Sequence, residues 1–308
     1  MQVVQELDFR PLFGGRTAVA AGNFDGLHLG HRKILRFLVE RARRESLRAV
    51  VLTFSPHPEK VLGRSQIAMI QTLSQRLEGF RSAGVQAVLV APFTRTFAGL
   101  SVTDFIERVL VGSLGARDII VGGDFRFGRG RLGGIRDLRL AGRRADFRVH
   151  PVSPVRRRGR VVSSSRIRKL LAAGAVEEAA VFLGHPYEIV GRVVGGSARG
   201  RTLGYPTANL RPENEIIPAG VFLTSTVVGG REHPSVTNIG TRPTFGWGPV
   251  RVETFLLNYR GDLYRRRVKL CFIRKLRSER AFPSAESLVE QIRSDVRAAG
   301  RYFKHPGG

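Results

Sequence analysis

Residues 22–31 read Gly22-Asn23-Phe24-Asp25-Gly26-Leu27-His28-Leu29-Gly30-His31. The apolar run Thr17 to Ala21 precedes them, and apolar residues recur at helical spacing from His31 to Glu45. The sequence therefore predicts a strand, a glycine-rich turn and a helix. Glycines let the backbone turn tightly, and a helix N-terminus presents unpaired N–H groups that favour phosphate. Two histidines three residues apart share one side of this turn, where they can stabilise charge on a leaving pyrophosphate.

The same alternation of strands and helices continues to about residue 185. Short apolar runs predict buried strands at Thr17–Ala21, Ala49–Phe54, Ala87–Ala91 and Asp118–Val121. Amphipathic runs predict helices at His31–Glu45, Leu73–Ala83 and Val102–Val111. This pattern favours an α/β domain, Rossmann-like, with a parallel sheet, helices on both faces and ligands at the carboxyl ends of the strands.

The pattern changes after Gly184, where helical periodicity stops until Ser284. Glycine, proline and asparagine clusters separate candidate strands at Tyr187–Val194, Val221–Val228, Val252–Asn258 and Arg267–Ile273. Short strands at this spacing predict a small β-barrel or sandwich, closed by a helix from Ser284 to about Ala299. We therefore expect two domains, residues 1–185 and 186–308.

Composition narrows the possible classes of protein. The 308 residues include 51 Lys and Arg against 25 Asp and Glu, a net charge of +26, which favours anionic partners. The 44 residues from Arg126 to Lys169 hold fifteen Arg or Lys and two acids. A single cysteine, Cys271, excludes an internal disulfide and fits the cytoplasm. Because no apolar run approaches about 18 residues, we expect no membrane partner.

Three further motifs follow strands or open helices in the first half. They are Thr53-Phe54-Ser55-Pro56-His57-Pro58, Gly123-Asp124-Phe125-Arg126-Phe127-Gly128 and Ser163-Ser164-Ser165-Arg166-Ile167-Arg168. Together with residues 22–31, they resemble the HxGH nucleotidyltransferase superfamily, and specifically the N-terminal half of bacterial bifunctional riboflavin kinase/FAD synthetases. Four ordered motifs are far more specific than one HxGH sequence.

The resemblance implies a role for each motif in binding FMN and ATP. It implies that His28 and His31 are catalytic and that His57, Asp124 and Phe125 bind the flavin. From the residues alone, Ser164 can cap a helix, and arginines offer forked donors to phosphate. Phe125 can stack on a ring or belong to the core. The nucleotide and its phosphates are expected to contact Gly22, Phe24, Asp25, Gly26, Gly30, Ser164, Arg166 and Arg168.

The second half carries a glycine-rich motif with hard oxygen ligands. Its sequence is Gly200-Arg201-Thr202-Leu203-Gly204-Tyr205-Pro206-Thr207-Ala208-Asn209-Leu210. Thr207 and Asn209 lie on one side of an extended chain, and Mg²⁺ accepts such oxygens alongside ATP phosphates. Gly200 leaves room for phosphate.

This motif resembles the riboflavin kinase signature, and three further motifs extend the resemblance. They are Pro218–Phe222, Asn238–Phe245 and Val252–Leu257. The resemblance implies that Glu253 is the general base, while Thr254 faces the other side of its strand. The chain has Phe255 and Asn258 where this family usually has His and Asp, and Arg265 where it commonly has Gly.

The expected function is therefore a two-step flavin synthesis. The β-rich half phosphorylates riboflavin to FMN, and the α/β half transfers AMP from ATP to FMN, giving FAD and pyrophosphate. Riboflavin, FMN and ATP are the expected substrates, with Mg²⁺ and without a specific nucleic acid. Two alternatives stay open: an adenylyltransferase with a degraded kinase site, and a basic protein that binds nucleic acid on the same scaffold.

Overall fold

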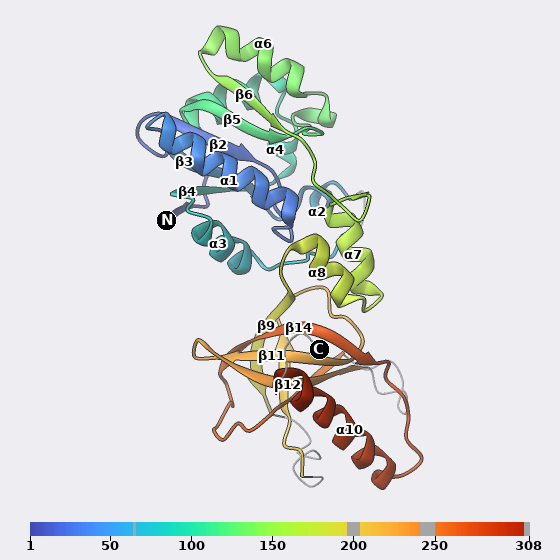
Figure 1. The fold of residues 1–308 in the computed structure, drawn as a ribbon. Helices are drawn as coiled ribbons and strands as arrows, with labels where there is room; N and C mark the ends of the chain where they lie inside the picture. The colour runs from blue at the N-terminus through green and yellow to red at the C-terminus, as the bar shows by residue number, and fades with distance from the viewer. Residues whose placement is uncertain (64–65, 196–203, 241–249, 305–308) are drawn as a thin grey trace. The chain divides into compact units, whose positions relative to one another are not determined.

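The computed structural model describes residues 1–63, 66–195, 204–240 and 250–304 (Figure 1). The chain packs into two units, and each is considered by itself. The first holds Met1–Ala68 and Leu73–Ser163, and the second holds Met69–Thr72 and Ser164–Gly308. Packing thus groups residues 164–185 with the second unit, while a division of the two activities at residue 185 stays a prediction.

A six-stranded sheet forms the centre of the first unit. Its strands lie in the order β1-β4-β3-β2-β5-β6, and all neighbouring pairs are parallel. They are β1 (Gln2–Val4), β2 (Thr17–Ala21), β3 (Arg48–Ser55), β4 (Ala87–Pro92), β5 (Ala116–Gly122) and β6 (Arg148–Val152). The parallel sheet and its four central strands confirm the prediction from apolar runs. The pattern does not indicate β1 or β6, because β1 is short and β6 reads Arg-Val-His-Pro-Val.

Helices cover both faces of this sheet. They are α1 (Leu29–Arg44), α2 (Pro58–Leu62), α3 (Leu73–Ser82), α4 (Arg95–Ala98), α5 (Val102–Asp104), η1 (Phe105–Ser113), η2 (Arg129–Arg131) and α6 (Ile135–Ala145). Alternate residues of β2 enter two cores: Ala18 packs with α1 and α3, and Val19 packs with η1 and α6. Most of the helix predicted at 102–111 is the π-helix η1, a form that the apolar spacing does not distinguish.

The order of the strands reverses between β2 and β5, which are neighbours although two other strands separate them in sequence. In open parallel sheets a ligand site lies at such a switch point, outside the carboxyl ends of the strands. The turn after β2 and the loop after β5 flank this point. The fold therefore places the motifs at 22–31 and 123–128 at one edge of the sheet.

A closed six-stranded barrel forms most of the second unit. Its order is β10-β13-β12-β11-β14-β9, and every neighbouring pair is antiparallel. The strands are β9 (Tyr187–Val194), β10 (Ala208–Pro212), β11 (Gly220–Val228), β12 (Arg231–Gly240), β13 (Arg251–Leu256) and β14 (Arg267–Arg277). A barrel, rather than a sandwich, is the correct choice of the two predicted architectures.

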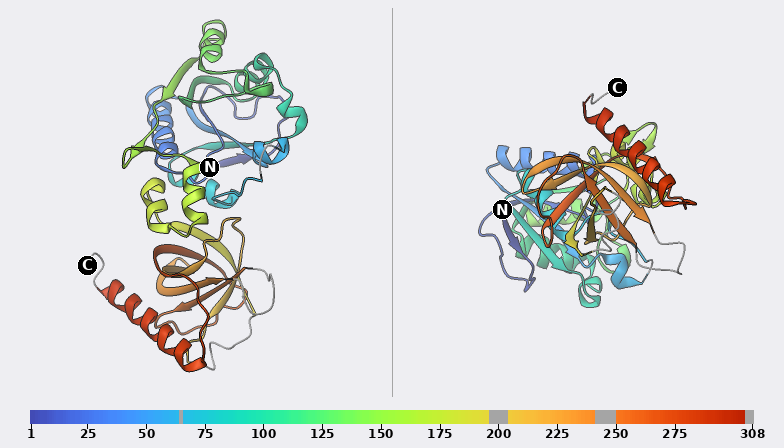
Figure 2. Two further views of the ribbon diagram at one scale, coloured as in Figure 1. Left: turned by 90° about the vertical axis from the view of Figure 1, so that its right-hand side faces the viewer. Right: turned by 90° about the horizontal axis from the view of Figure 1, so that it is seen from below.

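In the described part of the second unit, the helices that accompany the barrel are α7 (Ser164–Ala172), α8 (Val176–Leu183) and α10 (Ala285–Lys304). The last confirms the predicted terminal helix and lies along the outside of the barrel (Figure 2). Its Ala299 packs against Val221, Leu223 and Val236. A hairpin of β7 (Arg156–Arg157) and β8 (Arg160–Val161) closes the list and belongs to the first unit.

Hydroxyl groups fill part of the barrel interior. Thr224 contacts Ser235 and Thr237 through hydroxyl hydrogen bonds of 2.8 Å each. Thr237 donates to Thr254 at 3.0 Å. All four side chains are fully buried, so each hydroxyl needs such a partner. Thr254 thus faces inward, as its place beside Glu253 predicts.

Candidate functional site

The turn between β2 and α1 forces three residues into left-handed backbone. Phe24, Gly26 and Leu27 have φ angles of 50°, 89° and 39°. The turn ends at His28, which caps α1: its Nδ1 accepts a hydrogen bond from the backbone N–H of His31 at 3.3 Å. The chain therefore bends sharply and fixes the first histidine at the N-terminus of the helix.

The two predicted catalytic histidines lie together. The rings of His28 and His31 stack with centroids 3.6 Å apart and planes inclined by 14°. The edge of Phe24 meets His31 at 5.2 Å. A Cβ at Gly30 would lie 3.1 Å from His28 Cε1, a tight contact that the ring of His28 would have to relieve by moving slightly. Gly30 thus has a steric reason to be glycine.

Burial holds the pKa of His31 well below its usual 6.5, and the neighbouring His28 and Arg76 lower it further. Its imidazole is therefore neutral near pH 7 and carries one N–H. The buried Nδ1 of His31 has no hydrogen-bond partner among the described residues. A neutral ring with an unused polar atom suits hydrogen bonding to a substrate oxygen.

The motif after β3 supports the turn. His57 Nε2 lies 2.9 Å from Asn23 Nδ2, and His57 Nδ1 accepts from the backbone N–H of Glu59 at 3.2 Å. Both ring nitrogens are thus engaged within the protein. The face of the His57 ring is therefore the part that could form the predicted contact with the flavin. The structure brings His57 together with the 22–31 turn.

Arg76, on α3, is a member of this site that the sequence motifs do not include. Its guanidinium donates to the backbone oxygen of Asn23 at 2.9 Å and to Thr53 Oγ1 at 3.2 Å. It is only 3% exposed. In the sequence, Arg76 is one arginine in a helical run whose Leu73, Leu77 and Phe80 face the core. The sequence alone does not distinguish it from an exposed arginine.

The two residues predicted to bind the flavin in the loop after β5 lie in different environments. Asp124 is exposed, whereas Phe125 is half-buried and stacks on Phe127 at 5.7 Å. Phe125 packs against the core of the first unit. Phe125 therefore belongs at least partly to the hydrophobic core, which is one of the two roles predicted for it.

The Ser-Arg motif opens α7 in the second unit. Ser164 is the first residue of the helix, so Ser163, not Ser164, holds the preceding cap position. Arg166 lies over the ring of Phe182 in α8, with its guanidinium carbon 5.7 Å from the ring centre. Arg168, two residues on, is half-buried. The 22–31 turn belongs to the first unit.

The barrel brings three polar residues into one row. Asn209 of β10 is directly opposite Glu253 of β13, and Glu253 is directly opposite Asn238 of β12. Opposite residues in antiparallel pairs share a face. Glu253 is half-buried while its neighbours Val252 and Thr254 are fully buried, so the row lies on the outer face. Asn238 begins the Asn238–Phe245 motif, and the sequence alone indicates no role for it.

The signature loop leads into this row. Thr207 is half-buried and stands immediately before β10. Tyr205 meets Phe255 of β13 edge to face at 5.4 Å. Phe255, the first departure from the family pattern, thus packs against the signature loop. Gly200 and residues 241–245 lie outside the described part of the chain.

The only cysteine carries no site chemistry. Burial raises the pKa of the Cys271 thiol to about 12, and the nearby Glu188 carboxylate adds to this. The thiolate, which is the reactive form, is therefore absent at neutral pH.

Comparison with known proteins assigns both halves. The family model for FAD synthetase matches residues 13–166, and the model for riboflavin kinase matches residues 183–303. The chain is 39% identical to a bifunctional riboflavin kinase/FMN adenylyltransferase of Pseudomonas fluorescens over 97% of both chains. It is 37% identical to the protein of that name from Escherichia coli K12, covering 92% of this chain and 91% of the relative.

A relative from Bacillus subtilis with the same name is 35% identical over 94% of this chain and 93% of its own. Among solved structures, one of a Streptococcus pneumoniae protein described as a macrolide-efflux protein has a TM-score of 0.89, 28% identity, and coverage of 97% and 99% of the two chains. Both family models and the relatives agree on the two halves. The chain belongs to the family of bifunctional riboflavin kinase/FMN adenylyltransferases and carries both of its enzymatic domains.

Proposed function

We propose that the two reactions of this enzyme take place at separate sites, adenylyl transfer at the 22–31 turn and phosphoryl transfer at the Asn209–Glu253 row. The observation that carries the first assignment is the stacked pair His28 and His31 at the N-terminus of α1. The register that sets Asn209 against Glu253 carries the second.

In adenylyl transfer, a phosphate oxygen of FMN attacks the α-phosphorus of ATP. The bond from that phosphorus to the bridging oxygen breaks, and pyrophosphate leaves. Donors are needed where negative charge grows, and His28, His31 and the N–H groups that open α1 supply them. The neutral imidazole of His31 can donate a hydrogen bond to a leaving oxygen.

The other predicted residues bind the two substrates. The backbone of Gly22, Gly26 and Gly30 lets phosphate approach closely. Phe24 and Asp25, which the sequence predicts as nucleotide contacts, are almost fully buried, and we assign them instead to holding the turn. Arg166 and Arg168, with Ser164, bind ATP phosphates. His57, Asp124 and Phe125 bind the flavin.

In phosphoryl transfer, the ribityl hydroxyl of riboflavin attacks the γ-phosphorus of ATP, and ADP leaves. Glu253 accepts the hydroxyl proton, because a half-buried carboxylate on the outer face can reach a substrate while inward-facing Thr254 cannot. Asn238, directly opposite Glu253, orients this carboxylate. Positioning supplies most of the remaining rate enhancement.

The donors in the signature motif fit Mg²⁺, which prefers hard oxygen ligands and keeps several positions for water or phosphate. Thr207 and Asn209 would hold the ion through hydroxyl and amide oxygens, next to the carboxylate of Glu253. Mg²⁺ supplies neutralisation of charge on the ATP phosphates. Within the described ranges no three His, Cys, Asp or Glu side chains gather into a metal site.

We place the enzyme in the cytoplasm, where riboflavin, FMN and ATP meet and where a lone thiol stays reduced. No helix in the described part of the chain is long and apolar enough to cross a membrane. The enzyme acts without a nucleic acid partner. Salt-sensitive binding to nucleic acid, with no ATP-dependent flavin turnover, would contradict this proposal.

The first test removes one histidine. We expect His31→Ala to lower FAD formation from FMN by on the order of 10²- to 10³-fold, because one donor to the transition state is lost. FMN formation from riboflavin stays normal and serves as the control. Separating FMN from FAD over time measures both reactions in one sample. Unchanged FAD formation would disprove the role of the turn.

The second test removes the base. Glu253→Gln keeps the size of the side chain but cannot accept a proton, so FMN formation should fall by roughly 10²- to 10⁴-fold. Adenylylation of supplied FMN should be unaffected. Near-normal FMN formation would rule out Glu253 as base. A wild-type chain that makes FAD from FMN but no FMN from riboflavin would instead show that the kinase site is degraded.

A further inference from the structure

A buried guanidinium joins the ends of two central strands in the first unit. Arg76 donates to the backbone oxygen of Asn23, just past β2, at 2.9 Å. It also donates from both terminal nitrogens to the backbone oxygen of Phe54, near the end of β3, at 3.5 and 3.4 Å. The Thr53 hydroxyl, 3.2 Å away, donates in turn to the oxygen of Asn23 at 3.1 Å. One side chain thus fixes the carboxyl edge of the sheet where the catalytic turn begins.

This arrangement is expensive, so it needs a reason. Burial lowers the pKa of Arg76 because a charged guanidinium loses its hydration, and only the buried Asp25 carboxylate of the same turn opposes that effect. An apolar side chain would fill the same space at lower cost if packing were the only need. The Nε of Arg76 is buried without a partner among the described residues.

The same helix also packs tightly on the turn. A Cβ at Gly79, one helical turn from Arg76, would overlap the side chain of Leu27. Leu27 itself has left-handed backbone. Helix α3 therefore contacts the turn at two points. Arg76 binds Asn23 near the start of the turn, and Gly79 packs against Leu27 near its end.

We propose that Arg76 is a positioning residue for adenylyl transfer, whose forked hydrogen bonds to Asn23 and Phe54 hold the 22–31 turn so that His28 and His31 stay stacked toward the substrate. The proposal rests on the assignment of adenylyl transfer to this turn. A planar fork is required, because two carbonyl groups on different strands must be bound at once.

Arg76 also acts on the charge of His31. The charged groups that face His31 are His28, from its own turn, and Arg76, from α3, and each disfavours protonation of the ring. Removing the charge at position 76 should therefore raise the pKa of His31. A residue that only filled space would leave this titration unchanged.

The test compares Arg76→Met, Arg76→Lys and Arg81→Met in the full chain. Arg81 is an exposed arginine on the same helix and is the matched control. We expect Arg76→Met to lower kcat for FAD formation by up to about 10²-fold, with little change in KM, because the loss is one of alignment. The acid limb of the pH profile should move to higher pH. Arg81→Met should match the wild type in both.

Arg76→Lys separates alignment from charge. It keeps the positive charge but loses the fork, so kcat should fall while the acid limb stays in place. Full kcat in this variant, or an unshifted His31 titration by NMR in Arg76→Met, would overturn the proposal. If Arg76→Met does not fold, the Lys variant decides alone. Normal FAD formation in His31→Ala would instead overturn the assignment of adenylyl transfer to this turn. The two failures are therefore distinguishable.

Discussion

Two residues of the barrel unit hold left-handed backbone where the family pattern is broken. Asn258, at φ 54°, follows β13 in a turn, and Asn tolerates this conformation at least as well as Asp does. Its departure from Asp is therefore compatible with the turn. Arg265, at φ 62°, replaces a residue that is commonly Gly. A long side chain there is strained, and only glycine adopts this conformation without cost.

This difference predicts that Arg265→Gly stabilises the barrel unit. Relief of left-handed strain is worth about 1 kcal/mol, partly offset by the greater freedom of glycine in the unfolded chain. The backbone N–H of Arg265 that donates to Val193 at 3.0 Å is kept, while a contact of its guanidinium with Tyr264 is lost. Urea unfolding should show a gain of about 0.5 kcal/mol.

The neighbouring Arg266 provides the control, because it is also exposed but does not have positive φ. Arg266→Gly should lower the free energy of unfolding by about 0.5–1 kcal/mol, since glycine relieves no strain there and only increases the conformational entropy of the unfolded chain. A loss of stability in Arg265→Gly equal to that of the control would show that the left-handed backbone carries no strain.

Single residues show where sequence reasoning succeeds and where it stops. His28 and His31 are recognisable because glycines and an adjacent helix start make their spacing informative. Arg76 is not, because its partners are backbone oxygens on two strands distant in sequence. Asn238 is informative only through the strand register that sets it opposite Glu253. Contacts of this kind exist only in the folded chain.

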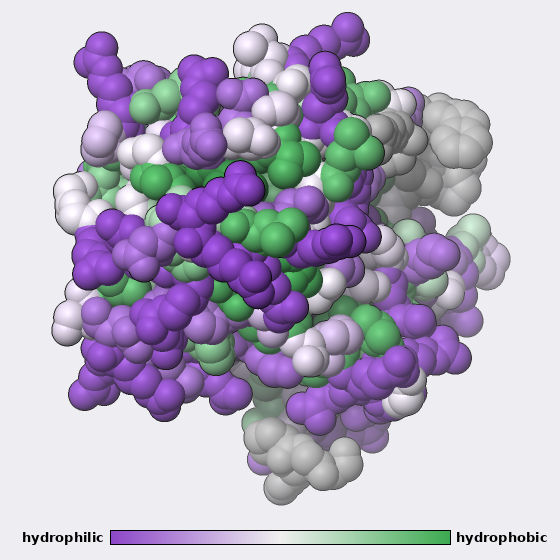
Figure 3. Space-filling model, turned by 90° about the horizontal axis from the view of Figure 1, so that it is seen from above, coloured by the Kyte–Doolittle hydropathy of each residue, from purple (hydrophilic) through white to green (hydrophobic). Residues whose placement is uncertain are grey.

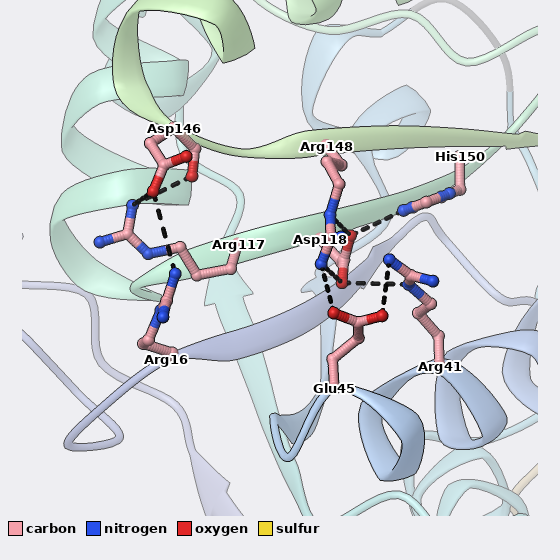
Figure 4. Close-up of polar contacts among 8 residues, drawn as sticks. All are labelled: Arg16, Arg41, Glu45, Arg117, Asp118, Asp146, Arg148 and His150. Carbon is pink, nitrogen blue, oxygen red and sulfur yellow. Dashed lines mark hydrogen bonds and ion pairs between the residues drawn. The ribbon is translucent and has the colours of Figure 1, made fainter.

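At the scale of elements, a buried carboxylate ties α1 to the sheet (Figure 4). Asp118 of β5 is fully buried and binds Arg148 and His150 of β6 at 3.1 and 2.7 Å. Arg41 of α1 reaches it at 3.2 Å. Glu45 completes the network by binding both arginines. The second edge strand β6, which has no apolar run, is thus held partly by charge.

We expect Asp118→Ala to destabilise the first unit by about 2–3 kcal/mol. Removing a buried carboxylate leaves its partners uncompensated, although both arginines can turn toward water, which limits the loss. Asp146→Asn is the control, because Asp146 is 85% exposed and pairs with Arg117 at 3.3 Å, and because Asn tolerates its left-handed backbone, at φ 53°. Its loss should be within about 1 kcal/mol. Equal losses in urea unfolding would argue that the burial of Asp118 has no energetic importance.

The network also predicts a dependence on acid. The hydrogen bond from Arg148 lowers the pKa of Glu45 from its usual 4.5, with smaller contributions from the charges of Arg148 and Arg41. A carboxylate with a lowered pKa contributes stability above the pKa of the unfolded chain, and that stability is lost as pH falls through the lower, folded value. Glu45→Gln should therefore reduce the decrease in the free energy of unfolding of the first unit as the pH falls below about 5. Urea unfolding at each pH measures this. A curve parallel to the wild type would contradict this.

Elements with a regular apolar pattern are those the sequence predicts, such as β2 to β5, α1 and α10. Strands β10 and β12 are not, because β12 begins Arg-Glu-His-Pro and β10 follows directly on the signature motif. Both are fixed by barrel closure, which pairs each strand with two others. Closure is a property of the whole barrel and leaves little trace in one strand.

At the scale of the molecule, the basic segment 126–169 spans both packing units. Its residues are divided between the two packing units, since α6 and the β7–β8 hairpin belong to the first and α7 to the second. Some of its charge is used internally, as Arg148 shows. Hydrophobic side chains interrupt the hydrophilic face seen in Figure 3. Part of the charge of this segment is therefore used in ion pairs within the first unit.

The contacts within the second unit predict which fragment of the chain is the more stable. A fragment from Tyr187 contains all six strands but lacks α8, whose Glu177 accepts from the backbone N–H of Lys275 at 3.1 Å. It also lacks residues 69–72, where the oxygen of Ile70 accepts from Tyr187 and Asn214 at 3.3 and 3.2 Å. Tyr187 and Asn214 are buried, so without Ile70 their polar groups lose a hydrogen-bond partner or become exposed to water.

We therefore expect a fragment 164–308 to be more stable than a fragment 187–308 and to keep riboflavin kinase activity, because it keeps α7, α8 and their contacts with the barrel. Each broken hydrogen bond of this kind costs about 1 kcal/mol, so the shorter fragment should unfold at a clearly lower urea concentration. Both lack residues 69–72 and therefore differ only in the two helices. Equal stability would show that α7 and α8 are not part of the kinase fold, and it would favour a division of the chain at residue 185. A folded but inactive longer fragment would show that the kinase needs residues of the first unit, which the row of Asn209 and Glu253 on the outer barrel face does not require.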